Sequence, residues 1–186
     1  MVQTRPSSQR GLSLIELVVA SAILAALVRF AVPAAQDLLL SIGLASASSE
    51  LVSDLVLARA EALKRNRRVA LCKSSDGEHC AQAGGWEQGW IVFHDENANG
   101  RPDDGEERIA RHGALPWHLH LTGNQPVARY ISYTAIGASK LTSGGFQAGT
   151  LTLCQRSADR TPSRRIILNA LGRPRVQKAT VDMCGG

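Results

Sequence analysis

Residues 12–28 read LSLIELVVASAILAALV, an apolar run of 17 residues that contains a single charged side chain, Glu16. An α-helix rises about 1.5 Å per residue, so this run reaches about 25 Å, at the short end of a bilayer span. Arg29 and Phe30 follow the run and suit a membrane interface. We therefore expect a transmembrane helix over residues 12–32.

A secretory signal peptide has the same order of charged and apolar segments, and residues 20–22 (ASA) resemble its cleavage site. Two features argue against a signal peptide. The Glu16 carboxylate costs roughly 2.5–3.5 kcal/mol within a bilayer unless it is paired. The helical pattern also continues past the apolar run, without the break that normally follows a cleavage site.

The helical pattern continues as far as Asn66. Apolar residues recur at spacings of three or four, which predicts a single buried stripe on a helix. The bases around residues 64–68 suit the negative C-terminal end of a helix. One helix over residues 12–66 would be about 80 Å long. The expected stripe consists of Leu44, Ala47, Leu51, Leu55, Ala58 and Ala62.

Residues 67–186 are expected to form a β-rich globular head. Eight short segments favour strands, and Gly, Pro, Asn and Asp separate them. One long helix and about seven strands predict an α+β fold, in which the helix packs on an antiparallel sheet. The segments are 69–72, 90–94, 108–111, 118–121, 130–133, 150–154, 165–168 and 175–177.

The overall composition excludes several classes of protein. The chain has 186 residues, of which 44% are hydrophobic, with 21 Lys and Arg against 16 Asp and Glu. It is too short for a multidomain enzyme and too apolar to be disordered. It contains no GxSxG, P-loop or HExxH motif and no plausible Cys–His dyad, so we expect neither enzymatic activity nor a cofactor.

Residues 11–17 (GLSLIEL) resemble the N-terminal signal of type IV pilins and pseudopilins. The resemblance implies that residues 1–11 are a leader, which a prepilin peptidase removes between Gly11 and Leu12 before methylating the new N-terminus. It implies that Glu16 neutralises the N-terminal amine of a neighbouring subunit during filament assembly. The protein would first cross the bacterial inner membrane once, with its head in the periplasm, and then reach the pilus at the cell surface.

The head carries further features of this family. Residues 89–93 (GWIVF), followed by an Asp-Asn-Asn-Gly pattern over 95–100, resemble FimT/FimU-type minor pilins and GspH-type pseudopilins. The loop between Cys72 and Cys80 and the late turn at residues 172–173 agree with this. The resemblance covers essentially the whole chain and implies other pilins as filament partners. Two departures are Leu12, where Phe is usual, and Arg29, which lies unusually deep in the apolar helix.

The four cysteines allow three pairings. None lies in a C-x-x-C motif, so zinc binding and thioredoxin-like chemistry are not expected. A translocated head lies in an oxidising compartment, which favours disulfides. We expect Cys72–Cys80 to close a local loop and Cys154–Cys184 to hold the C-terminus, with free buried thiols as the alternative.

Residues 95–106 (DENANGRPDDGE) match the pattern of an EF-hand calcium loop. Five side-chain oxygens and the Arg101 carbonyl would bind the ion, and Gly100 would make the sharp turn. The flanking segments favour strands, however, and a hairpin tip needs the same turn residues without any metal. We therefore favour a metal-free hairpin loop. The five candidate ligands are Asp95, Asn97, Asn99, Asp103 and Glu106.

Charge is segregated along the chain. Residues 74–107 contain nine acids and one base, Arg101, whereas residues 155–178 contain seven bases and one acid, Asp159. Such asymmetry indicates a polyanion-binding edge, and arginine favours bidentate contacts with phosphate. The seven bases are Arg156, Arg160, Arg164, Arg165, Arg173, Arg175 and Lys178.

Residues 172–175 (GRPR) resemble the C-terminal motif of FimT-type pilins that bind DNA in natural transformation. The leading hypothesis is therefore a minor pilin whose Arg173 and Arg175 contact DNA phosphates without reading the base sequence. We expect Arg164, Arg165 and Lys178 to assist. The alternatives are a solvated hairpin edge that only keeps the head soluble, and a structural minor pilin or GspH-like type II secretion pseudopilin that primes or caps a filament.

Overall fold

The computed structural model describes residues 14–184, apart from the side chains at positions 30, 33, 34 and 37. The leader, Gly11 and Leu12 therefore lie outside the described residues. The chain divides into two compact units, with the boundary between Leu40 and Ser41. One helix, α1 (Leu14–Arg65), contributes to both units.

The part of α1 in the first unit exposes its apolar side chains. Every Leu, Ile and Val from residue 14 to residue 29 is exposed, from Leu14 (81%) to Val28 (49%). An exposed apolar surface of this kind marks a site for a membrane or a protein partner. The surface fits membrane anchoring, and the expected transmembrane segment at 12–32 remains a prediction.

The second half of α1 has a different environment. Within the described residues, the stretch Leu38–Arg65 is long and apolar enough to cross a membrane by length and composition. However, Leu44, Leu51 and Leu55 are fully buried in the head. This stretch is therefore the core helix of the head, and all six residues of the expected stripe are buried, as predicted.

Helix α1 ends one residue before Asn66, close to the expected position. Asn66 adopts the left-handed conformation, with a φ of 52°. The backbone N–H of Arg67 then donates to the Ala62 carbonyl at 3.2 Å. This arrangement is a common helix C-cap, in which Asn replaces the more usual Gly.

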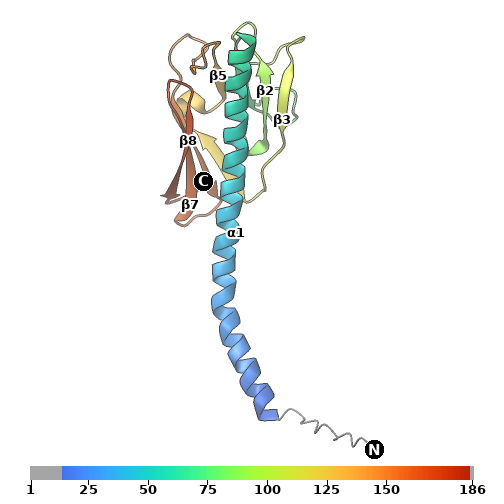
Figure 1. Cartoon of the computed structure of the whole chain (residues 1–186), viewed down its shortest axis with the longest axis vertical. Coiled ribbons are helices and arrows are strands. Elements are labelled where there is room, and N and C mark those ends of the chain that lie inside the picture. Colours follow the sequence, from blue (N-terminus) through green and yellow to red (C-terminus); the bar gives the residue numbers. More distant parts are fainter. Residues whose placement is uncertain (1–13, 185–186) are drawn as a thin grey trace, which may run out of the picture. The chain divides into compact units, whose positions relative to one another are not determined.

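The helix packs on antiparallel sheet, as predicted, and the head contains two four-stranded sheets, a division that the sequence did not predict (Figure 1). Two short 3-10 helices, η1 (Trp86–Gln88) and η2 (Gln125–Val127), lie between strands. Sheet A has the order β3 (Arg108–His112), β2 (Trp90–His94), β1 (Val69–Lys73), β5 (Tyr130–Tyr133). Sheet B has the order β4 (Leu119–Gly123), β6 (Gly149–Gln155), β7 (Thr161–Leu168), β8 (Pro174–Val181).

The core lies between α1 and the two sheets. Figure 1 shows the C-terminal part of α1 running alongside strands of both sheets. The indole Nε1 of Trp90 donates to Asp54 Oδ2 on the helix at 2.7 Å, and Arg59 Nε donates to the Gly137 carbonyl at 2.9 Å. Every buried side chain among the described residues lies from Leu44 onward, so the second unit carries the whole core.

Two disulfides hold loops onto this core. Cys72–Cys80 joins β1 to the following loop, with the two Cα atoms 5.5 Å apart. Cys154–Cys184 joins β6 to the C-terminal segment, with a Cα separation of 6.1 Å. These are the two pairings that we expected from the sequence.

Candidate functional site

The hairpin of β7 and β8 carries most of the bases that the sequence singled out. In its register, Arg164 lies opposite Lys178, and Ile167 lies opposite Arg175. Directly opposed residues share a face of a sheet, and successive residues alternate between faces. Arg165 and Arg175 therefore lie on one face of sheet B, whereas Arg164 and Lys178 lie on the other.

The face with Arg165 and Arg175 points away from the core, and we call it the outer face of sheet B. The opposite face carries buried residues such as Leu151 and Ile166. The outer face contains a shallow hollow of ≈ 450 Å³. The four strands contain no Asp or Glu, so no strand carboxylate opposes the arginines. The hollow is lined by Thr122, Gly123, Asn124, Thr150, Thr152, Arg165 and Ile167.

Arg164 is not part of this exposed set. Its side chain lies on the core side of β7, is only 8% exposed, and donates from Nη1 to the Ser163 carbonyl at 3.3 Å. A buried guanidinium has no access to a large external polyanion, which corrects the expectation that Arg164 assists. Lys178 is exposed, but it lies on the same side of β8 as the core-facing residues.

The turn between β7 and β8 requires glycine at position 172. Gly172 has a φ of +75°, and a Cβ there would lie 2.3 Å from the Gly137 carbonyl oxygen. Asn169 closes the turn, because its carbonyl accepts from the Gly172 N–H (2.9 Å) and its Oδ1 accepts from the Arg173 N–H (3.0 Å). The turn therefore fixes the backbone from which Arg173 extends.

Arg173 borders a groove between this turn and α1. The groove has a volume of ≈ 430 Å³ and is mainly apolar. On the helix side, Val56 is 51% exposed and Leu63 is 46% exposed. Arg173 thus borders a groove that Arg175, two residues later, does not line. The groove is lined by Val56, Arg59, Ala60, Leu63, Arg173 and Pro174.

Some bases of the segment 155–178 form ion pairs and others do not. Arg156 Nη2 lies 3.1 Å from Glu87 Oε1, and Arg160 Nε lies 3.9 Å from Asp182 Oδ1. In the part of the chain that the structure describes, four exposed bases of this segment form no ion pair. These four are Arg165, Arg173, Arg175 and Lys178.

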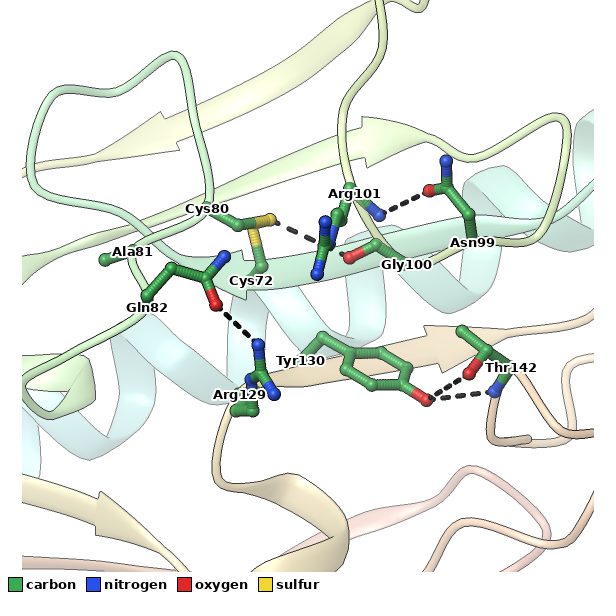
Figure 2. A pocket seen from close by; sticks show the side chains of 10 residues that line it. All are labelled: Cys72, Cys80, Ala81, Gln82, Asn99, Gly100, Arg101, Arg129, Tyr130 and Thr142. Atoms are coloured by element: carbon green, nitrogen blue, oxygen red, sulfur yellow. Dashed lines mark hydrogen bonds between the residues drawn. A yellow bond between two sulfur atoms is a disulfide. The ribbon is translucent and has the colours of Figure 1, made fainter.

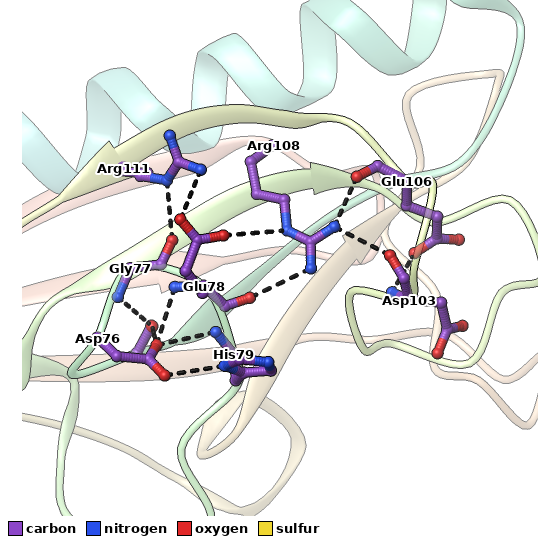
Figure 3. Close-up of polar contacts among 9 residues, drawn as sticks. Asp76, Gly77, Glu78, His79, Asp103, Glu106, Arg108 and Arg111 are labelled. Atoms are coloured by element: carbon purple, nitrogen blue, oxygen red, sulfur yellow. Dashed lines mark hydrogen bonds and ion pairs between the residues drawn. The ribbon is translucent and has the colours of Figure 1, made fainter.

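Acids in the stretch at residues 74–107, by contrast, accept hydrogen bonds from backbone N–H groups and from Arg111, which lies just beyond the stretch (Figure 3). Asp76 accepts hydrogen bonds from the backbone N–H groups of His79 and Glu78, both at 2.8 Å, and these bonds lower the pKa of its carboxyl. Glu78 Oε1 accepts from Arg111 Nη2 at 2.8 Å. Arg108 Nη1 donates to the Asp103 carbonyl at 2.9 Å.

Bases from outside the stretch pair with other acids within it. Arg67 Nη1 donates to Glu96 Oε1 at 2.9 Å. Arg65 forms an ion pair with Glu107, and this pairing lowers the pKa of the Glu107 carboxyl. Four acids of the stretch, Glu78, Glu87, Glu96 and Glu107, therefore form ion pairs with arginines that lie outside it.

The loop that matches the calcium pattern connects β2 to β3, so strands flank it, as expected for a hairpin. Asp95 is fully buried and accepts from the Gly100 N–H at 3.2 Å, and burial raises the pKa of its carboxyl. The amide nitrogens of Asn97 and Asn99 each donate to Asp103 Oδ2 at 2.7 Å. Within residues 14–184, no group of three or more His, Cys, Asp or Glu side chains forms a metal site. The metal-free hairpin loop that the sequence favours remains a prediction, with calcium binding as its alternative.

The sequence analysis missed the threonines of the outer face. Thr150 and Thr152 alternate with buried leucines along β6, and Thr122 lies opposite Thr152 on β4. The signal was present as a period-two pattern of hydroxyl residues. Only the strand pairing, however, places these hydroxyls beside Arg165.

Comparisons with known proteins agree with this architecture. The family model of the type II transport protein GspH matches residues 47–172, and that of the prokaryotic N-terminal methylation motif matches residues 6–28. The pilin-like protein PilA1 of Thermus thermophilus is 32% identical over 181 residues, which cover 91% of this chain and 99% of that protein.

Among solved structures, the type IV minor pilin FimU of Pseudomonas aeruginosa has a similar fold. Its TM-score is 0.54 at 18% identity, with 76% of this chain and 95% of that chain covered. A second crystal form of FimU gives a TM-score of 0.52. The GspH model matches more than half of the chain, so this protein belongs to the GspH family and is a minor type IV pilin or pseudopilin.

Proposed function

We propose that this minor pilin binds DNA without sequence specificity during DNA uptake, and that the outer face of sheet B is the contact surface. The observation that carries the proposal is that Arg165 and Arg175 lie on one exposed face of a sheet whose four strands contain no Asp or Glu. The two residues lie on a diagonal of the hairpin, so their Cβ atoms are roughly 7–8 Å apart. Both guanidiniums are thus available to neighbouring phosphates of one backbone.

The chemistry of this face suits a sugar–phosphate backbone. Guanidinium groups bind phosphate oxygens in a bidentate manner, and hydroxyl groups such as those of Thr150 and Thr152 also donate to phosphates. The face lacks a protruding helix or ribbon that would enter a groove and read base edges. Contacts with the backbone alone give weak, sequence-tolerant and salt-sensitive binding.

The residues of the expected site now have distinct roles in the proposal. Arg165 and Arg175 form the centre, and Arg173 extends the surface at the turn. Lys178 lies on the opposite face of β8 and adds to the positive charge of this end strand. Arg164 is excluded by its burial.

The test is a titration of DNA into the full-length protein in a non-ionic detergent, followed by fluorescence anisotropy. With about three phosphates neutralised, the slope of log K against log salt should be about −2.7 for duplex DNA. Arg165→Gln/Arg175→Gln should weaken binding at least tenfold. The matched control is Arg67→Gln/Arg111→Gln, which removes two bases that pair with acids and should leave the affinity within about twofold.

An unchanged affinity in Arg165→Gln/Arg175→Gln would refute the assigned surface. If the wild-type protein binds no DNA at low salt, the structural alternative gains support, namely a subunit that primes or caps a filament. The apolar groove between Val56, Leu63 and Pro174 favours that alternative, because an exposed apolar groove suits a protein contact. Filament assembly with and without Val56→Ser/Leu63→Ser would then be the decisive measurement.

We also propose that the chain is processed and anchored as its N-terminal motif implies. A prepilin peptidase would cut between Gly11 and Leu12, and the apolar helix that follows would hold the protein in the inner membrane until assembly with other pilins. Glu16 would then receive the N-terminal amine of a neighbouring subunit. Mass spectrometry of the mature N-terminus tests the cut, since an N-methylated Leu12 is expected.

A further inference from the structure

A second cluster of arginines lies on sheet A, apart from the proposed DNA surface. Arg101 comes from the loop between β2 and β3, and Arg129 immediately precedes β5. Both line a pocket of ≈ 190 Å³ beside the Cys72–Cys80 disulfide (Figure 2). The remaining lining residues are uncharged.

The walls of this pocket are held firmly in place. The Tyr130 hydroxyl donates to Thr142 Oγ1 at 3.2 Å and accepts from the Thr142 N–H at 2.9 Å. Gly100 packs so closely that an added Cβ would lie 3.2 Å from the Tyr130 ring. Arg129 is oriented by a hydrogen bond from its Nη2 to Gln82 Oε1 (Figure 2). The cavity is therefore a preformed feature.

The arginines of the pocket are exceptional in their charge environment. Arg101 is the single base in a stretch with nine acids, and several of those acids pair with other bases. Within the described chain, neither Arg101 nor Arg129 forms an ion pair with a carboxylate. The ammonium of Lys73 lies near enough for the Arg129 charge to help lower its pKa, after the larger effect of burial.

We infer that the pocket binds a phosphate group, with Arg101 and Arg129 as its ligands. Two guanidiniums supply two positive charges and planar forks of N–H donors, which match the geometry of phosphate. A phosphate monoester carries about −1.5 to −2 charges at pH 7, so one group would balance the pair. The same chemistry is offered by free phosphate and by a small phosphate ester.

The experiment is isothermal titration calorimetry of the full-length protein in a non-ionic detergent, with chloride keeping the ionic strength constant. Inorganic phosphate, glycerol 3-phosphate and acetate are titrated separately. We expect saturable phosphate binding with a Kd of about 1 mM or tighter and at least tenfold weaker binding of acetate. Tighter binding of glycerol 3-phosphate than of phosphate would identify an ester as the preferred ligand, and the reverse order would identify the free anion.

Arg101→Gln/Arg129→Gln should weaken phosphate binding at least tenfold. Arg101→Lys/Arg129→Lys keeps both charges but removes the forked N–H donors, so its affinity for phosphate should lie between those of the wild type and the Gln variant. This Lys variant also tests the assignment if the Gln variant folds poorly. The matched control is Arg67→Gln/Arg156→Gln, which removes two ion-paired bases that do not line the pocket and should leave phosphate binding unchanged. The assignment is overturned if wild-type binding does not saturate, if the Gln variant keeps wild-type affinity, or if acetate binds as tightly as phosphate.

Discussion

The acidic loops at residues 74–107 and the basic hairpin of β7 and β8 are each rich in charges of one sign in the sequence. In the folded protein, the two regions differ in how many of those charges have a bonding partner. In the loops, acids such as Asp76, Glu78 and Glu107 are bonded to backbone N–H groups or to arginines. On the hairpin, Arg165 and Arg175 have no such partner within residues 14–184. The comparison teaches that a run of like charges becomes an unpaired surface only where the fold brings no counter-charges to it.

A disulfide borders each of the two regions, and removing the two disulfides in turn should give the largest difference between the regions. Cys154→Ala/Cys184→Ala opens a link across 30 residues and should lower the free energy of unfolding by about 3–4 kcal/mol. Cys72→Ala/Cys80→Ala opens a link across 8 residues and should cost about 2–3 kcal/mol. Urea unfolding of both variants measures the difference, and a larger loss for the shorter link would contradict the loop-length explanation.

Glycine substitutions sharpen the comparison further. Gly172→Ala in the basic hairpin meets both a positive φ and the Gly137 carbonyl, so we expect a loss of about 3 kcal/mol and weaker DNA binding through Arg173. Gly105→Ala in the acidic loops has a φ of +88° but open space around it, so only about 1 kcal/mol should be lost. Thermal unfolding checks both values, and equal losses would show that crowding at Gly137 is unimportant.

The acidic loops should respond to pH where the basic hairpin does not. The pKa of Asp76 is lower in the folded protein than its ordinary value, so its ionised form contributes stability above about pH 4. That contribution disappears as the pH falls through the lowered folded-state pKa. Asp76→Asn should therefore reduce the urea midpoint at pH 7 and have a progressively smaller effect toward pH 2.

Asp104→Asn is the control for this pH dependence, because Asp104 lies exposed in the same stretch. Its replacement should leave the midpoint nearly unchanged at both pH values. A reduction that is equal for Asp76→Asn at pH 7 and at pH 2 would show that the carboxylate charge is not the cause.

The smallest expected effect on stability comes from single arginine substitutions, one at a base that pairs with the acidic loops and one on the basic hairpin, which distinguish a loss of stability from a loss of DNA affinity. Arg67 and Glu96 form an exposed ion pair, with 59% and 55% of their side chains accessible, so Arg67→Gln should cost at most about 0.5 kcal/mol. Arg165→Gln breaks no ion pair and should leave the unfolding curve unchanged while it reduces DNA affinity severalfold. Parallel unfolding and anisotropy measurements on the two variants give this contrast, which fails if Arg165→Gln destabilises the head more than Arg67→Gln.

Local patterns predicted much of the fold. The spacing of leucines and alanines predicted which side of α1 is buried, and the segments rich in β-branched residues predicted all eight strands within a few residues. The division of those strands between two sheets was not predictable, because it depends on pairings between distant segments such as β1 and β5.

The candidate site was predicted in composition but not in arrangement. The sequence singled out Arg164 together with Arg165, although neighbouring residues on a strand point to opposite faces, and the register buries the first of them. Ion pairs between residues that are far apart in the sequence were equally unpredictable. Arg156 neutralises Glu87 from 69 positions away, and no local rule predicts that contact.

The position of β8 at the end of sheet B has a consequence for how neighbouring molecules coexist at high local concentration. An end strand presents backbone groups that invite pairing with the strand of another chain, the route to aggregation. Pro174 offers no N–H at the start of β8, and charged residues at 175 and 178 oppose the close approach of a second basic edge. The same charges that we propose to contact DNA would thus oppose strand pairing between the sheets of two heads.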